Sequence, residues 1–355
     1  MKPAPPLPAR DLSLVLERTA PLWEEVRGSR IFLTGGTGFF GCWLVESFCH
    51  INRELGLNAS ITILTRNPAA FTAKCPHLAS DPAVHLLAGD VRSFSFPSGA
   101  FSHIIHAATD TDARTAANAP VEMLSAIIAG TERVLQFAQA CGPRKFLLTS
   151  SGAVYGKQPS TMTHVPETWP GAPDPLSPAS VYAEGKRAAE LLCALYQQTG
   201  SLECKVARCW AFCGPHLPFD RHFAIGNFIG DVLAGRPIRI QGDGTPRRSY
   251  LYAADLAIWL WTILFRAPAL IPINVGSGHD VSILELAQTV AAALNPKTEI
   301  LVDREPVPGA SPLRYVPSVD RARELLQLDV TVGLPESIHR TAEWHKASPI
   351  AFAQQ

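Results

Sequence analysis

The sequence lacks an excess of charge of either sign, because its 31 lysines and arginines are balanced by 31 aspartates and glutamates. Proteins that bind nucleic acid usually carry a basic surplus, so this balance argues against a nucleic-acid partner. Any site for an anion must be built locally and not by the field of the whole chain. The low charged fraction, 17% beside 47% hydrophobic residues, favours a large folded core over a disordered chain.

The eight cysteines include no CxxC pair and no cluster with zinc-finger spacing. Most of them lie in apolar stretches, where reduced cysteine serves as a small hydrophobic residue. We therefore expect free thiols, no metal site and a cytoplasmic location. The proline-rich start, residues 1–10, has no apolar signal core. The most apolar run, residues 253–273, contains Asp255, Arg266 and two prolines, so we expect a buried helix and no membrane span.

Short apolar runs alternate with helix-like stretches along the first two thirds of the chain. The expected strands are Arg30–Thr34, Ile61–Thr65, Val84–Ala88, His103–Ala107, Lys145–Ser150 and Lys205–Cys209. The expected helices are Asp11–Arg27, Cys42–Arg53, Val121–Ala140 and Val181–Gln198. This alternation predicts an α/β fold with a Rossmann-like, doubly wound parallel sheet that is covered by helices on both faces.

A glycine-rich segment, Thr34–Gly41, lies between the first expected strand and its helix. Gly35 suits a tight turn, Gly38 lets the backbone approach a pyrophosphate, and Gly41 allows the helix to pack closely on the strand. The start of the helix adds free N–H groups and the positive end of its dipole. The segment therefore predicts a dinucleotide site, although a plain strand–helix turn is the alternative. The expected cofactor contacts here are Gly35, Thr37, Gly38, Phe39, Phe40 and Gly41.

Further cofactor contacts are expected where the next strands end. The second strand runs into Arg66, where an NAD site often has an acid that binds the ribose. An arginine in this place favours a 2′-phosphate, so we expect NADP(H), with NAD(H) possible and a solvent-exposed loop arginine as the alternative. Asp90 after the third strand suits the adenine amino group. Small residues after the fourth strand let a cofactor lie against the backbone, and the remaining expected contacts are Val91, Ala107 and Ala108.

A tyrosine and a lysine, Tyr182 and Lys186, stand four residues apart in an expected helix. On a helix the two side chains share one face, where the ammonium would lower the pKa of the phenol towards the working range. Ser151 ends the fifth strand, at the edge of the sheet where open α/β folds bind ligands. We expect Ser151, Tyr182 and Lys186 to be the catalytic residues. Tyr182 and Lys186 would also contact the cofactor, with Lys186 on the nicotinamide ribose.

Over about residues 29–344, the chain resembles the extended short-chain dehydrogenase/reductases of the NAD(P)-dependent nucleotide-sugar epimerase/dehydratase family. The matching segments are Thr34–Gly41, His106–Ala108, Ser150–Gly156, Tyr182–Lys186, Arg208–Pro215, Gly242–Asp255 and Arg314–Pro317. The resemblance implies an NAD(P)-dependent enzyme of carbohydrate biosynthesis whose substrate is a nucleotide-diphosphate sugar.

The composition changes near residue 212, after which proline, glycine and arginine become frequent. We expect residues 1–28 to form a helical extension and residues 29–211 to form the NAD(P)-binding domain, to which residues 251–277 return. Residues 212–250 and 278–355 would form a smaller C-terminal α/β lobe that binds the nucleotide sugar.

The resemblance also implies substrate contacts. Arg248 matches an arginine that binds the nucleotide diphosphate in relatives, which suits the forked hydrogen bonds of a guanidinium. Asn227 and Arg314 match positions that bind the nucleotide, and Ser151 would contact the sugar. Ala211 departs from the family, since relatives usually have an asparagine there. Surface polar residues without a ligand are the alternative for Asn227, Arg248 and Arg314.

The segment after Ser151 departs from part of the family. Relatives that remove water have an Asp-Glu pair, and UDP-glucuronate decarboxylases a glutamate, where this chain has Gly152 and Ala153. Neither residue titrates, which disfavours a 4,6-dehydratase or a decarboxylase. We expect hydride transfer at the hexose C4, as NADPH-dependent reduction of an NDP-4-keto-(6-deoxy)hexose. An NDP-sugar 4-epimerase with tightly bound NAD is the alternative. A non-catalytic NADP-binding sensor is another, although such sensors typically lack the Tyr/Lys pair.

Relatives pair through two long helices that correspond here to Val121–Ala140 and Val181–Gln198. The apolar content of both helices is high for exposed surfaces, so we expect a homodimer. The alternative is that both helices only cover the sheet.

Overall fold

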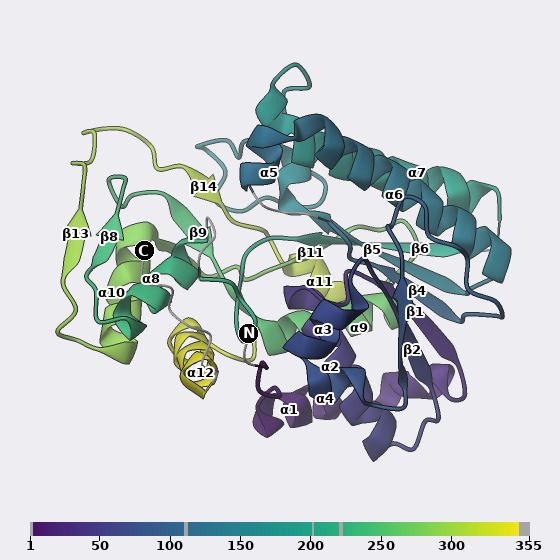
Figure 1. Cartoon of the computed structure of the whole chain (residues 1–355). Helices are drawn as coiled ribbons and strands as arrows, with labels where there is room; N and C mark the ends of the chain where they lie inside the picture. Colours follow the sequence, from purple (N-terminus) through teal and green to yellow (C-terminus); the bar gives the residue numbers. More distant parts are fainter. Residues whose placement is uncertain (1–2, 110–112, 201, 220–222, 348–355) are drawn as a thin grey trace.

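The computed structural model describes residues 3–109, 113–200, 202–219 and 223–347 of the chain. Its centre is a seven-stranded sheet in the order β11-β6-β5-β4-β1-β2-β3, with every neighbouring pair parallel (Figure 1). The strands are β1 Arg30–Thr34, β2 Ser60–Thr65, β3 Val84–Ala88, β4 His103–His106, β5 Lys145–Ser151, β6 Glu203–Cys209 and β11 Ile273–Val275. This order confirms the predicted doubly wound sheet, and its direction reverses between β1 and β4, where such folds bind ligands.

Helices cover both faces of the sheet (Figure 1). One face packs against α1 Ala9–Thr19, the 3₁₀ turn Ala20–Val26, α2 Phe39–Glu54 and α9 Ala253–Arg266. The other face packs against α6 Pro120–Cys141 and α7 Val181–Gln198. Every residue of α9 from Ala253 to Phe265 is buried, as its composition predicted. Of the helices in the described ranges, none has the length and hydropathy that crossing a membrane requires.

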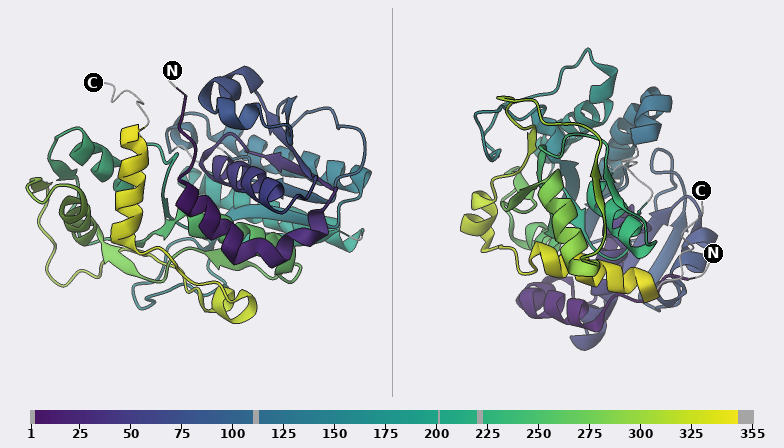
Figure 2. Two further views of the ribbon diagram at one scale, coloured as in Figure 1. Left: turned by 90° about the horizontal axis from the view of Figure 1, so that it is seen from below. Right: turned by 90° about the vertical axis from the view of Figure 1, so that its left-hand side faces the viewer.

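A smaller lobe lies beside the sheet (Figure 2). It contains α8 Ala224–Leu233, α10 Ile283–Leu294 and α12 Leu334–Ala347, with strands β8 Ile238–Ile240, β9 Arg247–Ser249, β12 Asp280–Ser282, β13 Ile300–Val302 and β14 Arg314–Tyr315. The other elements are α3 Pro68–Lys74, α4 Pro76–Ala79, α5 Ala113–Asn118, β7 Phe212–Cys213, β10 Leu251–Tyr252, α11 Asp320–Leu326, and 3₁₀ turns at Gly152–Tyr155 and Pro178–Ser180. Residues 251–277 contain α9 and β11, which places them with the sheet.

The N-terminal extension joins the two parts of the chain. Asp11 of α1 accepts hydrogen bonds from Arg340 of α12 at 2.6 Å and from the Tyr252 hydroxyl at 2.7 Å. A second ion pair, Arg10 to Glu343 at 2.9 Å, connects the same two helices. Because Asp11 is fully buried, loss of its partners would leave an uncompensated charge in the interior.

Candidate active site

The glycine loop lies against the end of β4. Gly35 has φ +75°, and a Cβ atom there would lie 2.5 Å from the Ala107 carbonyl. At Gly41 a Cβ would lie 2.3 Å from the Gly35 carbonyl oxygen, so the start of α2 can approach the loop only without a side chain. At Gly38 a Cβ would make only an ordinary van der Waals contact, 3.5 Å from the same oxygen. The close approach of Gly38 to a pyrophosphate therefore stays a prediction. The cradle fits a dinucleotide, which needs backbone and ligand to come close.

The start of α2 offers backbone donors to a phosphate. Its N-cap, Gly38, provides no side-chain cap, so the N–H groups of the first turn have no partner from it. The side chains of the first turn point elsewhere: the Phe40 ring packs edge-on against Phe212 at 5.0 Å, and Phe39 contacts Phe40 at 5.7 Å. The Thr37 carbonyl accepts a hydrogen bond from Lys74 at 2.9 Å. Fixed side chains and free backbone donors are what an anion site at a helix start requires.

The residues at the ends of β2 and β3 form a charged group. Asp90 accepts two hydrogen bonds from the Arg92 guanidinium, at 2.8 and 3.0 Å, and this contact lowers the pKa of Asp90 to about 2. Arg66 lies close enough to contribute to that lowering, and it is exposed. No ion pair of Arg66 is found among the described residues, so its guanidinium is available to a phosphate. Val91 lies near α6, where a Cβ on Gly130 would meet it at 2.9 Å.

Lys186 is buried at the centre of the site. Its ammonium donates hydrogen bonds to the Thr109 hydroxyl at 2.6 Å and to the Thr149 carbonyl at 2.8 Å. The ammonium lies 6.0 Å from the centroid of the Tyr182 ring. Ala108, which precedes Thr109, donates its N–H to Thr34 at 3.1 Å, so the end of β4 is tied to β1 beside the glycine loop. Burial lowers the pKa of Lys186 to about 8.

Tyr182 lies beside Ser151 at the carboxyl end of β5. Burial raises the pKa of Tyr182 to about 12, and a hydrogen bond with the Ser151 hydroxyl only partly offsets this effect. The predicted lowering of the Tyr182 pKa by Lys186 is therefore wrong for this structure, because burial raises the pKa and Ser151, not Lys186, is the group that lowers it. The neighbouring Ser150 points away, since its hydroxyl donates to Glu190 at 2.5 Å. The structure thus brings Ser151, Tyr182 and Lys186 together as the sequence predicted, with a neutral phenol at pH 7.

Two aromatic residues that the sequence did not indicate fill the space beside Ser151. A Cβ on Gly152 would lie 2.6 Å from the Trp210 ring and 2.8 Å from the Tyr315 hydroxyl. The Trp210 and Tyr315 rings have centroids 4.4 Å apart. Burial raises the pKa of Tyr315, and its hydroxyl interacts with Ser151. Their positions in the sequence could have indicated both residues. Trp210 precedes the unusual Ala211, and Tyr315 lies inside a segment that resembles the family.

The strand register separates Arg248 and Arg314, the two arginines that were predicted to bind the nucleotide sugar. β9 pairs with β14 so that Arg248 is opposite Tyr315 and Arg247 is opposite Arg314. The Arg248 guanidinium lies 5.6 Å from the centroid of the ring of Tyr315, whose hydroxyl interacts with Ser151. Side chains alternate along a strand, and Arg314 instead pairs with Asp280 at 2.9 Å. The structure therefore brings Arg248, and not Arg314, towards Tyr315 and Ser151.

Asn227 on α8 has a polar atom without a partner. Its side-chain oxygen is buried and makes no hydrogen bond to any described residue. Such groups are rare in folded proteins and call for a specific explanation. A ligand donor would satisfy the oxygen, in agreement with the predicted contact to a nucleotide.

Ala211 stands where the resemblance implies an asparagine, and its methyl group cannot make the hydrogen bonds of an amide. The Ala211 carbonyl accepts the Leu251 N–H at 3.0 Å.

The fold and site together define an extended short-chain dehydrogenase/reductase. Residues 31–276 match the family model of the NAD-dependent epimerase/dehydratase family. The chain is 30% identical to UDP-glucuronic acid decarboxylase 6 of Arabidopsis thaliana over 310 residues, 87% of this chain and 86% of the relative. The chain therefore belongs to the NAD-dependent epimerase/dehydratase family, as its motifs predicted, and its relatives act on nucleotide sugars.

Solved structures agree with this assignment. The UDP-glucose 4-epimerase of Thermus thermophilus, in complex with NAD, has a TM-score of 0.73 and 26% identity, covering 90% of this chain and 99% of that chain. The UDP-glucuronic acid 4-epimerase of Bacillus cereus, in complex with UDP-glucuronic acid and NAD, has a TM-score of 0.74 and 22% identity, covering 90% of this chain and 99% of that chain. The second likeness concerns the fold alone. The family is NAD-dependent, and a preference of this chain for NADP stays a prediction.

Proposed function

We propose that this enzyme transfers hydride at C4 of a nucleotide-diphosphate hexose, and that it reduces a 4-keto group with NADPH. The observation that supports this most is the absence of an acid or base at residues 152 and 153. In addition, Trp210 and Tyr315 take the space that a side chain at Gly152 would need. Loss of water or of carbon dioxide needs proton transfers beyond those of a reduction. A reduction needs one proton, which the catalytic residues provide.

The proton comes from Tyr182 in this proposal. Its raised pKa, about 12, keeps the phenol protonated at neutral pH, as a general acid in a reduction requires. Ser151 interacts with Tyr182 and Tyr315 and would orient the substrate oxygen between the two phenols. Lys186 orders the site through Thr109 and Thr149 and would bind the nicotinamide ribose.

The cofactor would lie along the glycine loop, with its pyrophosphate at the start of α2. The bound nicotinamide supplies the hydride, and Arg66 would pair with a 2′-phosphate in a charge-assisted hydrogen bond. Arg248 would bind the diphosphate of the sugar nucleotide, and the unsatisfied oxygen of Asn227 would accept a hydrogen bond from the nucleotide. We also propose that the protein forms a homodimer through α6 and α7.

A 4-epimerase with NAD is the second candidate. It is favoured by the NAD-dependent family and by the 26% identity to a 4-epimerase whose structure contains NAD. The same three catalytic residues would serve it, since an epimerase oxidises C4 and returns hydride to the other face. The two candidates differ in whether net reduction of the sugar occurs.

The test is a panel of UDP-, dTDP-, GDP- and CDP-hexoses and their 4-keto derivatives, each incubated with NADPH or NADH. Products are separated by mass and configuration. A reductase consumes NADPH in stoichiometric amount with a 4-keto sugar and leaves the saturated sugars unchanged. An epimerase instead interconverts the saturated sugars without net consumption of cofactor. Carbon dioxide from UDP-glucuronic acid would contradict both candidates.

A further inference from the structure

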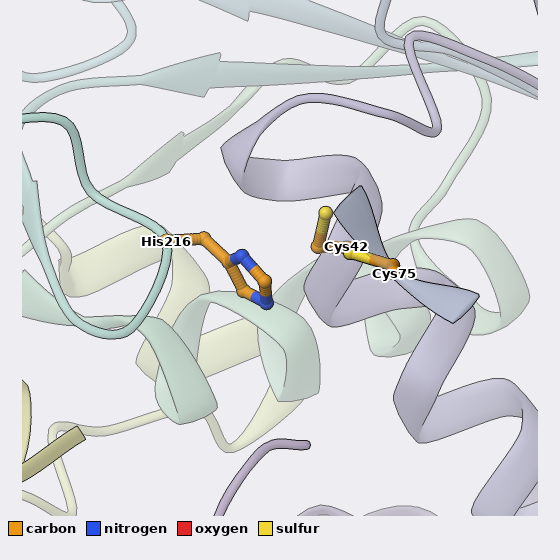
Figure 3. A group of neighbouring side chains, drawn as sticks. All are labelled: Cys42, Cys75 and His216. Carbon is orange, nitrogen blue, oxygen red and sulfur yellow. The ribbon is translucent and has the colours of Figure 1, made fainter. Parts of the chain in front are cut away.

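Outside the candidate active site, three side chains of types that can bind metals lie close together. Cys42 lies near the start of α2, Cys75 lies between α3 and α4, and His216 follows β7 in the smaller lobe (Figure 3). One ligand atom from each residue lies within 4.8 Å of the other two. Both cysteines are fully buried. The residues are far apart in sequence, so the fold alone creates this cluster.

We propose that Cys42, Cys75 and His216 bind a zinc ion. Two thiolates and one imidazole are a ligand set that zinc prefers, and borderline-soft donors disfavour magnesium and calcium. Zinc bonds of about 2.0–2.3 Å in a tetrahedron place ligand atoms roughly 3.3–3.8 Å apart. The three ligand atoms lie within 4.8 Å of one another, so they would need to move together only slightly to reach that geometry. Three protein ligands leave one position for water or another donor.

His216 has two features that its packing does not explain. Its backbone has φ +69°, a left-handed conformation that is uncommon for residues other than glycine. Its Nε2 atom is buried and has no hydrogen-bond partner among the described residues. The ring is kept in place by Trp344, whose ring centroid lies 4.5 Å away. A metal ion bound through Nε2 would satisfy this nitrogen, and it would explain why the backbone is held in an uncommon conformation.

The surroundings of Cys42 suit a thiolate ligand. The Lys74 ammonium lies 3.7 Å from the Cys42 sulfur and 2.9 Å from the Thr37 carbonyl oxygen. From this distance the ammonium can donate a hydrogen bond to a zinc-bound sulfur and hold it in place. Two thiolates would neutralise the charge of one zinc ion in this buried place.

Binding at this site would connect the cofactor loop to the smaller lobe. Cys42 lies one residue after Gly41, and its sulfur contacts the Thr37 carbonyl at 3.8 Å. The Trp43 indole already donates to the Pro215 carbonyl at 2.9 Å, so α2 and the segment with His216 are in direct contact. Zinc would therefore stabilise the junction between the cofactor loop and the smaller lobe. This stabilising role does not depend on the reaction proposed above.

The test is the zinc content of the full-length protein, purified without chelator and measured by elemental mass spectrometry after dialysis. We expect about one zinc per chain, and a rise in thermal stability when zinc is returned to chelated protein. Replacement of zinc by cobalt should give thiolate-to-cobalt absorption in the near ultraviolet. Cys42→Ser and His216→Asn should each weaken zinc binding by at least about tenfold. Asn tolerates the left-handed backbone at this position, so His216→Asn removes the imidazole with little strain.

Cys193→Ser is the matched control, because Cys193 also contacts a second buried cysteine, Cys204, but belongs to no such cluster among the described residues. It should leave the zinc content unchanged. Three results would overturn the proposal: no zinc or cobalt bound by the wild-type protein, full zinc content in Cys42→Ser and His216→Asn, or a Cys42–Cys75 disulfide that persists under mild reduction. If a variant does not fold, the wild-type metal content and cobalt spectrum decide the question alone.

Discussion

The Tyr315 hydroxyl lies 2.8 Å from the point that a Cβ atom on Gly152 would occupy. The Trp210 ring lies even closer to that point, at 2.6 Å. Glycine at position 152 is therefore coupled to two aromatic residues from distant segments. This packing takes the space that a side chain after Ser151 would need, and the proposed reaction therefore uses Ser151, Tyr182 and Lys186.

Gly152→Ala should lower both stability and turnover, because the methyl group would overlap the Trp210 ring. Overpacking of this kind costs about 1–3 kcal/mol of the free energy of unfolding. Urea unfolding and steady-state rates of the same preparation measure the two effects. Gly333→Ala is the control, since a Cβ there meets nothing within 4 Å. Equal stability of Gly152→Ala and wild type would show that Trp210 and Tyr315 do not fill the space beside Gly152.

Tyr182→Phe should reduce turnover by about 100- to 10,000-fold while cofactor affinity stays nearly unchanged. The ring and its packing remain, but the proton donor is lost. Steady-state kinetics with the authentic substrate and cofactor titration by fluorescence separate the two quantities. Tyr196→Phe, on the same helix, changes a phenol far from the site and should have no effect. Retention of most activity in Tyr182→Phe would refute its role as the acid.

The sheet and the meeting of Ser151, Tyr182 and Lys186 could be predicted because their signals are local. Alternating apolar runs gave β1 to β6 nearly to the residue, and the Tyr182–Lys186 spacing placed both side chains on one helix. The raised pKa of Tyr182 could not be predicted, because it depends on burial by the folded chain. The packing of Trp210 and Tyr315 at Gly152 requires the sheet edge and β14 to meet. The cluster of Cys42, Cys75 and His216 was missed for the same reason, since spacing in sequence does not report proximity between lobes.

The rate should fall as the pH rises above about 8, because burial lowers the pKa of Lys186 to about 8 and the proposed role needs the ammonium. The free energy of unfolding should change with pH in the opposite direction to the rate. The unfolded pKa of lysine is about 10.4, so the folded state binds fewer protons between these values. The contribution of Lys186 to the free energy of unfolding therefore rises with pH in that window. Lys186→Met should remove this rise in pH-dependent urea unfolding, and an unchanged slope would contradict the assignment.

Arg66→Ala should weaken NADPH binding by roughly tenfold or more and leave NADH binding nearly unchanged. The lost interaction is a hydrogen bond to a charged group, worth about 1.5–3 kcal/mol. Calorimetric titration of cofactor-free protein with both nucleotides gives the two affinities. Arg53→Ala, in the last turn of α2, removes a similar charge and serves as the control. Tighter binding of NADH than of NADPH by the wild type would contradict this role of Arg66 and favour the 4-epimerase function.

Leu191→Glu should convert a dimer into a monomer. Leu191 and Leu195 lie one turn apart on α7 and are 60% and 49% exposed, although both side chains are large and apolar. Gly185 brings the same helix close to Ile127 of α6, so both helices present one continuous surface. Light scattering during gel filtration at micromolar concentration measures the mass. Leu325→Glu, at a similarly exposed leucine of α11, should leave the mass unchanged. A monomeric wild type would contradict the proposed dimer.

We propose that this enzyme transfers hydride at C4 without elimination or decarboxylation. The most direct measurement follows deuterium from nicotinamide-labelled NADPH into the product of a 4-keto nucleotide hexose, with the position of the label read by NMR. We predict one deuterium at C4 in a sugar whose carbon chain and hydroxyl groups are otherwise unchanged. A product that has lost water or carbon dioxide, or one without label at C4, would contradict the account.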